Sequence, residues 1–147
     1  MTLTVTKKST EQLFNEISSQ ADVTDFLSKN EKELKVLSLC AYLNNMLGLH
    51  PVKKAELFRR AGLAGNNYGY ELFQNDNKSP SRDLLLRLCI AFPLSIDETQ
   101  LALRNAGLAT LYPRDMRDAY ILFALKNRIG VDSLNNLLAD KGLKELN

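Results

Sequence analysis

The sequence predicts an all-α protein. Helix-start signatures, in which a Ser or Asn is followed three residues later by Gln or Glu, occur at Ser9, Asn30 and Ser95. Each is followed by apolar residues at helical spacing, and glycines stand where several of these apolar stretches end. No segment requires a strand, so we expect helices throughout.

Composition indicates a compact globular chain. Of 147 residues, 45% are hydrophobic and 24% are charged, which is enough to build a core without disulfides or metal. No apolar run approaches the ~18 residues that a membrane span requires. The first ten residues lack the apolar core of a signal peptide. We therefore expect a cytoplasmic protein with no membrane association.

The residues that usually hold metals or perform catalysis are scarce. The chain has one His and two Cys and lacks CxxC and HxxxH patterns, so we expect no metal and no cofactor. Cys40 and Cys89 lie in apolar helical patterns, which favours two buried thiols over a disulfide. His50 precedes a proline, and nothing near it in sequence could orient it, so it is interpreted as a turn residue.

An enzyme is not expected. The chain has no phosphate-binding loop, no nucleophile-elbow pentapeptide and no His partner for a cysteine nucleophile. Asp115 and Asp118 lie one helical turn apart, but Arg114 and Arg117 alternate with them. Ion pairs on a solvated helix face explain that spacing more simply than catalysis does.

Residues 1–29 are predicted to form an N-terminal helical appendage. The capping box at Ser9 opens a helix to about Ser19, and Asp22 can cap a second short helix.

The segment 30–110 is predicted to hold five helices. The first runs from Asn30 to Gly48 along a stripe of apolar residues. The second ends at Gly62, which can take a left-handed conformation, and the third restarts near Asn66 with Tyr70 and Phe73 as its buried face. The remaining boundaries are a cap at Ser79, Pro80 in the first helical position, a stop at Pro93, a capping box at Ser95 and an end at Gly107.

Residues 111–147 are predicted to form a C-terminal helical extension that packs on this core as one compact unit. Its first helix should start at Tyr112 and end at Gly130, with apolar residues on two sides. Such a helix must be enclosed, either by the domain or by a second copy. Asp132 should cap a last helix that ends at Gly142.

The segment from Lys53 to Arg82 carries a family resemblance. Gly62-Leu63 closes one helix, Gly65 to Tyr68 opens the next, Tyr70 and Phe73 anchor it, and Pro80-Ser81 opens a further helix. In this arrangement the chain resembles the lambda-repressor-like, Xre-type helix-turn-helix regulators. The segment 111–115 and the helix after it resemble a C-terminal extension carried by some of these proteins.

The resemblance implies a sequence-specific, DNA-binding transcriptional regulator, with the helix of Asn66 to Asn75 in the major groove of double-stranded DNA. Asn and Gln can pair with adenine, Glu can accept from cytosine, and flanking basic groups can hold phosphates. Leu72 is expected near the exposed face as well. The candidate DNA-binding residues are Lys53, Lys54, Asn66, Asn67, Tyr68, Glu71, Gln74, Asn75, Lys78, Ser81 and Arg82.

The charge pattern keeps a second hypothesis open. The chain has a formal net charge of +2, and residues 49–82 hold six basic against three acidic side chains. However, no Lys or Arg lies between Asn66 and Asp76, where Arg would make the commonest specific base contact. The alternative is a protein–protein interaction module on the same fold, without DNA binding. Homodimerisation through the C-terminal helices is compatible with both hypotheses.

Overall fold

The computed structural model describes residues 9, 11, 12, 38–65 and 67–147. By its contacts the chain divides into two units, Met1–Leu37 and Ser38–Asn147. In the described part of the first unit, the backbone N–H of Ser9 donates to Gln12 Oε1 at 2.8 Å and that of Gln12 donates to Ser9 Oγ at 3.1 Å. The predicted capping box is thus confirmed, whereas the rest of the predicted appendage and the helix start at Asn30 lie outside the described residues.

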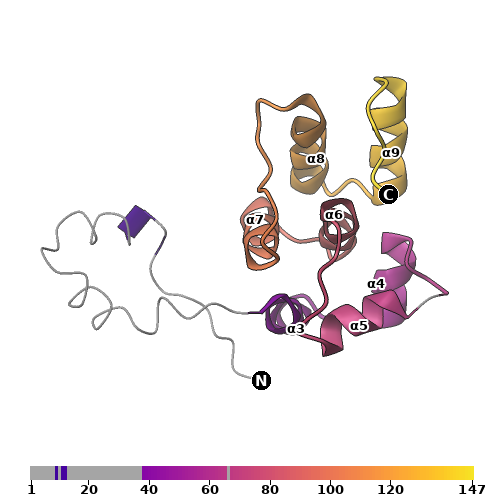
Figure 1. Cartoon of the computed structure of the whole chain (residues 1–147). Coiled ribbons are helices and arrows are strands. Elements are labelled where there is room, and N and C mark those ends of the chain that lie inside the picture. Colours follow the sequence, from indigo (N-terminus) through magenta and orange to yellow (C-terminus); the bar gives the residue numbers. More distant parts are fainter. Residues whose placement is uncertain (1–8, 10, 13–37, 66) are drawn as a thin grey trace, which may run out of the picture. The chain divides into compact units, whose positions relative to one another are not determined.

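The second unit is helical, and its described residues contain no strand, which confirms the all-α class for this part of the chain (Figure 1). In Figure 1, α6 lies amid the other helices, in contact with α4, α7 and α9. Helix α3 packs on α5 and α7, and α8 packs on α7 and α9. The helices are α3 (Leu39–Leu49), α4 (Lys54–Ala61), α5 (Tyr68–Gln74), α6 (Arg82–Ala91), α7 (Ile96–Asn105), α8 (Met116–Asn127) and α9 (Val131–Asp140).

The core is centred on α6, because most of this helix is buried against its neighbours. Leu85, Leu86 and Leu88 are fully buried, and so is the Cys89 thiol. Cys40 is only half-buried, and both cysteines are free, as predicted. Burial raises the pKa of the Cys89 thiol to about 12, so Cys89 behaves as an apolar core residue. None of the helices described is long and apolar enough to cross a membrane.

Several helix ends follow the predicted local chemistry. Ser95 and Glu98 form both halves of a capping box, with backbone-to-side-chain distances of 2.9 and 3.1 Å. Gly62 and Gly107 both adopt left-handed conformations, with φ of 75° and 70°. The residue after each glycine donates its N–H back into the preceding helix, so the two ends share one geometry.

Other helix starts differ from the prediction. Ser81, and not Ser79, caps α6 by accepting from Leu84 N at 3.1 Å. Helix α8 starts at Met116 behind the cap Asp115, so Tyr112 and Pro113 precede it. The cap of α9 is Gly130, and Asp132 lies within its first turn. At α6 the two serines have the same capping ability, so the sequence pattern does not rank them.

The start of α3 and the environment of His50 are also different. Ser38 has extended backbone angles and caps α3, so the described helix begins at Leu39. His50 has an orienting partner after all. Its Nε2 lies 2.9 Å from a carboxylate oxygen of Glu98, 48 residues away in sequence.

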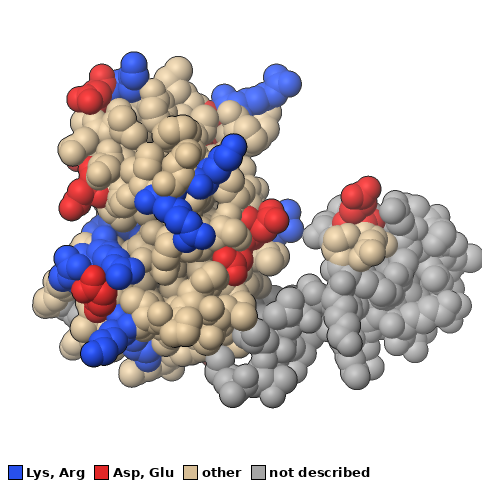
Figure 2. All heavy atoms as spheres, turned by 180° about the vertical axis from the view of Figure 1, so that it is seen from behind, with Lys and Arg blue, Asp and Glu red and all other residues tan. Residues whose placement is uncertain are grey.

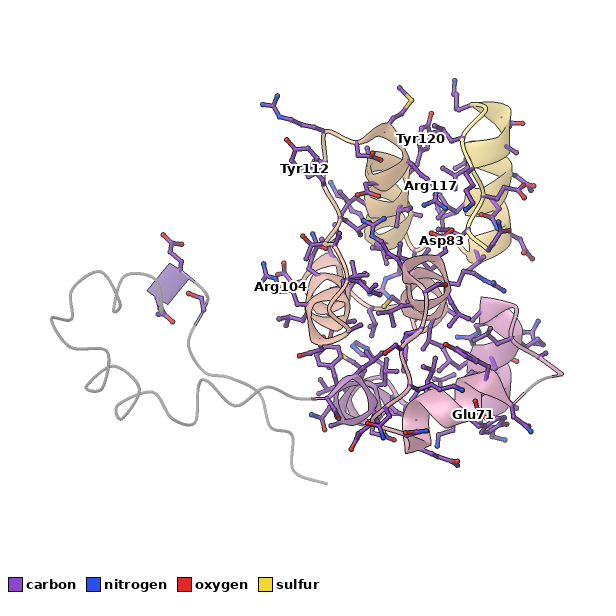
Figure 3. All side chains as sticks on the ribbon, in the orientation of Figure 1. Glu71, Asp83, Arg104, Tyr112, Arg117 and Tyr120 are labelled. Atoms are coloured by element: carbon purple, nitrogen blue, oxygen red, sulfur yellow. The ribbon has the colours of Figure 1, made fainter. Side chains whose placement is uncertain are left out.

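The predicted solvated face of Asp115 and Asp118 is wrong, because Asp118 is only 6% exposed. Its carboxylate accepts two hydrogen bonds from Arg82, at 2.9 and 3.1 Å. Arg117 reaches in the same direction and pairs with Asp83 at 2.9 and 3.1 Å (Figure 3). These two ion pairs join the start of α6 to α8.

Two amide side chains hold the segments that follow α7 and α9. Gln100 both donates to Leu111 O and accepts from Leu111 N, at 3.0 and 2.7 Å. Asn135 does the same to Leu146, at 3.2 and 2.7 Å. Each amide thereby replaces a missing backbone partner. Gln100 joins the start of the C-terminal extension to α7, and Asn135 holds the last residues against α9.

Only one of the two apolar sides of α8 is enclosed. Ile121, Ala124 and Leu125 are buried, whereas Met116 is 64% and Phe123 is 53% exposed. Among the described residues, therefore, no segment covers the second side.

Gly69 gives a test of how closely α4 and α5 approach each other. A Cβ atom at Gly69 would lie 2.8 Å from ring carbons of Phe58, closer than carbon atoms pack. We expect Gly69→Ala to lower the free energy of unfolding by about 1–3 kcal/mol, measured by urea denaturation. Gly48→Ala is the matched control, because nothing lies within 4 Å of its added Cβ, and it should stabilise α3 by about 0.5–1 kcal/mol. Equal effects of the two changes would contradict the close approach.

The Asp83–Arg117 pair gives a pH dependence. Burial alone would raise the pKa of Asp83, but hydrogen bonds and charge from Arg117 outweigh it and hold the pKa below its ordinary value of 3.8. A lowered folded-state pKa stabilises the fold above the unfolded pKa, and this contribution is lost as pH falls through the folded value. The free energy of unfolding, measured between about pH 5 and pH 2, should therefore fall less steeply in Asp83→Asn than in wild type. Asp140→Asn, which removes an exposed carboxylate, should keep the wild-type slope.

Candidate nucleic-acid interface

Helix α5 is fixed to the domain by one side of its two turns. Gly69, Leu72 and Phe73 are buried, and the Phe58 ring of α4 packs edge-on against Phe73 with ring centroids 5.8 Å apart. Tyr70 also packs edge-on against Phe58, with ring centroids 4.7 Å apart, yet is 38% exposed. The prediction is therefore wrong on two residues: Leu72 is core, and Tyr70 lies at its edge. Gly69 explains both positions. Because it has no side chain, α5 can turn this face toward α4 and approach it closely.

The opposite side of α5 is polar and exposed. Asn67, Glu71 and Gln74 lie at i, i+4 and i+7, so they share one helical face. Asn75 is exposed beyond the end of the helix, and its Oδ1 accepts from Asn77 N at 2.9 Å. Asn66, another predicted contact, lies outside the described residues. Four of the predicted DNA contacts are thus exposed on or next to α5: Asn67, Glu71, Gln74 and Asn75.

The predicted basic groups near α5 have different surroundings. Lys53 is exposed at the N-cap of α4, and Lys54 Nζ lies 5.2 Å from the centre of the Phe73 ring. Lys78 Nζ lies 2.8 Å from a carboxylate oxygen of Glu71 and 5.1 Å from the centre of the Tyr68 ring. The hydrogen bond to Glu71 raises the pKa of Lys78. Glu71 therefore balances the nearest lysine, and Lys53 and Lys54 supply the positive charge beside α5.

Arg82 is not placed as a surface phosphate clamp. Besides its two bonds to Asp118, its guanidinium donates to Ala109 O at 2.9 Å and to Thr110 O at 3.2 Å. Its side chain is 24% exposed. The structure thus assigns Arg82 to the joint between α6 and the C-terminal extension. Ser81 is exposed, but its Oγ accepts the capping bond of α6.

Acidic residues around the interface are also engaged. Asp76 accepts a hydrogen bond from the Ser38 hydroxyl at 2.8 Å, so it supports the start of α3. Figure 3 shows Glu71 on α5, where it is exposed. On the face shown in Figure 2, Lys and Arg side chains are interspersed with Asp and Glu and form no continuous basic stripe. Of the predicted basic contacts, Lys78 and Arg82 are paired with carboxylates, so the electrostatic footprint of the interface is small.

Sequence reasoning missed the role of Arg87. Its guanidinium donates to Ala61 O and Gly62 O, both at 2.9 Å, and so binds the carbonyl end of α4. These partners lie 26 and 25 residues away, and no local pattern could indicate them. Positive charge at the carbonyl end of a helix is also favourable to its dipole.

Comparison with protein-family models, curated proteins and solved structures finds no match to this chain.

The assignment of Arg82 to the core joint predicts a loss of stability in Arg82→Lys. Lysine keeps the charge but cannot serve two carbonyls and both oxygens of Asp118 at once. We expect the free energy of unfolding to fall by about 2 kcal/mol, the order of one charge-assisted hydrogen bond. Arg114→Lys, at an exposed position, is the control and should be neutral. If Arg82→Lys is as stable as wild type, Arg82 does not hold the joint between α6 and the C-terminal extension.

Proposed function

We propose that residues 38–147 form a DNA-binding domain of the lambda-repressor-like, Xre type, which reads double-stranded DNA with α5 and acts in transcription regulation. The observation that carries this proposal is the polar face of α5, formed by Asn67, Glu71 and Gln74, on a helix whose other side is fixed in the core. A helix displayed in this way can enter the major groove, where amide side chains pair with adenine and a carboxylate accepts from cytosine.

Phosphate contacts would come from the residues beside α5. Lys53 and Lys54 lie at the N-terminal end of α4, where the helix dipole also favours an anion. Ser81 and Lys78 lie near the start of α6, and a phosphate could draw Lys78 away from Glu71. Since few basic residues are available, recognition would depend more on amide contacts and DNA shape than on phosphate charge.

The proposal is tested with a screen of random duplexes at low salt, followed by measurement of affinity against salt concentration. Lys53→Ala combined with Lys54→Ala should weaken binding to all sequences and lower the slope of log affinity against log salt by about two. Asn67→Ala should instead change the preferred base, since a paired contact discriminates by about 1–3 kcal/mol.

The matched control removes two positive charges from the C-terminal extension, one just before α8 and one in its last turn. Arg114→Ala combined with Lys126→Ala should leave affinity and salt slope near wild type, because both residues are exposed and α8 lies away from α5 (Figure 1). If no duplex binds at low salt, DNA binding is rejected. An equal loss in the control pair would show that affinity reflects net charge and not this interface.

A protein-interaction module is the second candidate, and the exposed side of α8 favours it. Phe123, Met116 and Tyr112 are each more than half exposed, which is costly unless a partner covers them. A failed duplex screen would leave this function as the better explanation. The two functions are compatible in one chain, because a regulator can use one surface for DNA and another for a protein or a second copy.

A further inference from the structure

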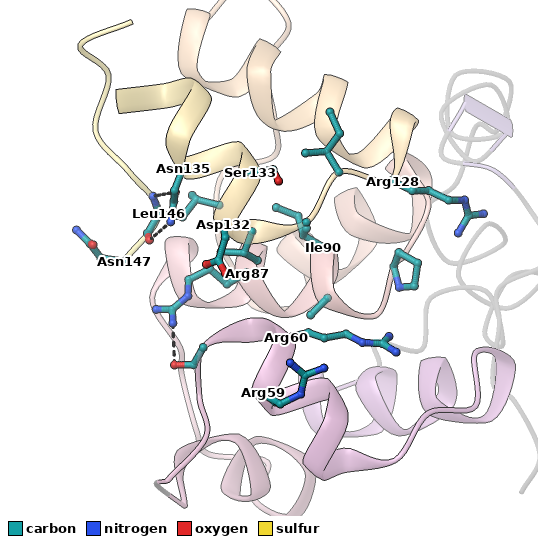
Figure 4. Close-up of a pocket in the computed structure, with 16 residues that line it drawn as sticks. Arg59, Arg60, Arg87, Ile90, Arg128, Asp132, Ser133, Asn135, Leu146 and Asn147 are labelled. Carbon is teal, nitrogen blue, oxygen red and sulfur yellow. Dashed lines mark hydrogen bonds between the residues drawn. The ribbon is translucent and has the colours of Figure 1, made fainter. Parts of the chain in front are cut away.

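A pocket of about 740 Å³ lies between the end of α4, the second half of α6 and the start of α9 (Figure 4). Ile90 and Ala91 of α6, with Ile129 before α9, form part of an apolar wall. None of its lining residues belongs to α5, so it is separate from the proposed DNA interface. Pockets of roughly 300–1,000 Å³ that combine apolar walls with a few charged groups are typical of small-molecule sites.

Arginines from three segments line this pocket: Arg59 and Arg60 of α4, Arg87 of α6, and Arg128 at the end of α8. Among the described lining residues, Asp132 is the one acidic side chain. The chain's last residue, Asn147, also lines the pocket, but at the opposite end from Arg128 in Figure 4. Positive charge is therefore concentrated toward the end that Arg60 and Arg128 occupy.

These guanidinium groups keep donors and charge available. Arg59 and Arg60 share one carboxylate, that of Glu56, whose pKa the Arg59 hydrogen bond lowers to about 2. Arg60 uses its Nε for that pair, at 3.1 Å, and both terminal nitrogens stay free for a ligand in the described structure. Arg87 donates to neutral carbonyls and forms no ion pair within the described part of the chain.

Arg128 is the residue that the fold itself does not explain. It ends α8 with φ of 55°, a left-handed conformation that favours glycine or asparagine. Its side chain is exposed, and within the described part of the chain it has no recorded hydrogen bond or ion pair. Figure 4 shows it extending to the same side of the pocket as Arg60. A strained position that holds a free cation at a pocket points to a ligand.

We propose that this pocket binds a small phosphorylated molecule, with Arg60 and Arg128 on the phosphate and the apolar wall of Ile90 and Ile129 against the uncharged part. Guanidinium groups match phosphate oxygens in charge and in paired hydrogen-bond geometry. The pocket's volume and its apolar wall suit a small molecule. The site does not depend on the proposed DNA binding.

The test uses adenosine 5′-monophosphate, inorganic phosphate and adenosine as probes on the full chain. Calorimetry measures affinity, and amide NMR shifts at Gly130 and Ile129 report the location. The nucleotide should bind and shift these amides, phosphate should bind more weakly at the same place, and adenosine should not bind measurably. Arg128→Gly should weaken nucleotide binding at least tenfold. Its melting temperature should not fall, because glycine prefers the left-handed conformation.

Arg114→Ala is the control of matched charge, since Arg114 is exposed and does not line the pocket. It should keep wild-type nucleotide affinity. The proposal is overturned if neither nucleotide nor phosphate moves the pocket amides at millimolar concentration, if adenosine binds as tightly as the nucleotide, or if Arg128→Gly binds like wild type. Displacement of the nucleotide by duplex DNA would assign the arginines to DNA instead. A negative duplex screen has no bearing on this site, because Lys53, Lys54 and α5 do not line it.

Discussion

The enclosure of α6 is the constraint on which the rest of the domain depends. Its apolar residues are buried against α4, α7 and α9, so its charged residues can leave the core only near the helix ends and edges. Between them these charged residues reach two neighbours. Arg82 and Asp83 bind α8 and the segment before it, and Arg87 binds the carbonyl end of α4. One helix therefore fixes both the α4–α5 pair and the C-terminal extension.

This use of charge inside the domain explains why the surface around α5 is not strongly basic. A count of Lys and Arg along the sequence includes Arg82, which is taken up by Asp118, and Lys78, which is balanced by Glu71. The net charge of a segment overstates the electrostatic potential at its surface when its charged residues form ion pairs with residues far away in the sequence. Of the basic residues described between 49 and 82, Lys53 and Lys54 form no ion pair with a carboxylate, and Arg59 and Arg60 share the single carboxylate of Glu56.

Sequence patterns predicted what neighbouring residues determine among themselves. The capping box at Ser95 and the left-handed ends at Gly62 and Gly107 need only a few consecutive residues, and all are present. The patterns failed where contacts between residues far apart in the sequence determine the structure. Asp118 is buried because Arg82, 36 residues away, reaches it. The pocket could not be predicted at all, because its walls come from segments that meet only in the folded chain.

Helix α5 has seven residues and no side-chain cap, which is shorter than the roughly 12–15 residues at which an isolated helix becomes marginally stable. Its order is therefore supplied by Phe58, Phe73 and the neighbouring helices. A segment of this kind opens by local unfolding at lower free energy than the core around α6. The amide protons of α5 should then exchange with solvent well before those of α6. Helix α5 would therefore have two states, one packed and one open. Any partner that binds only the packed state would slow this exchange.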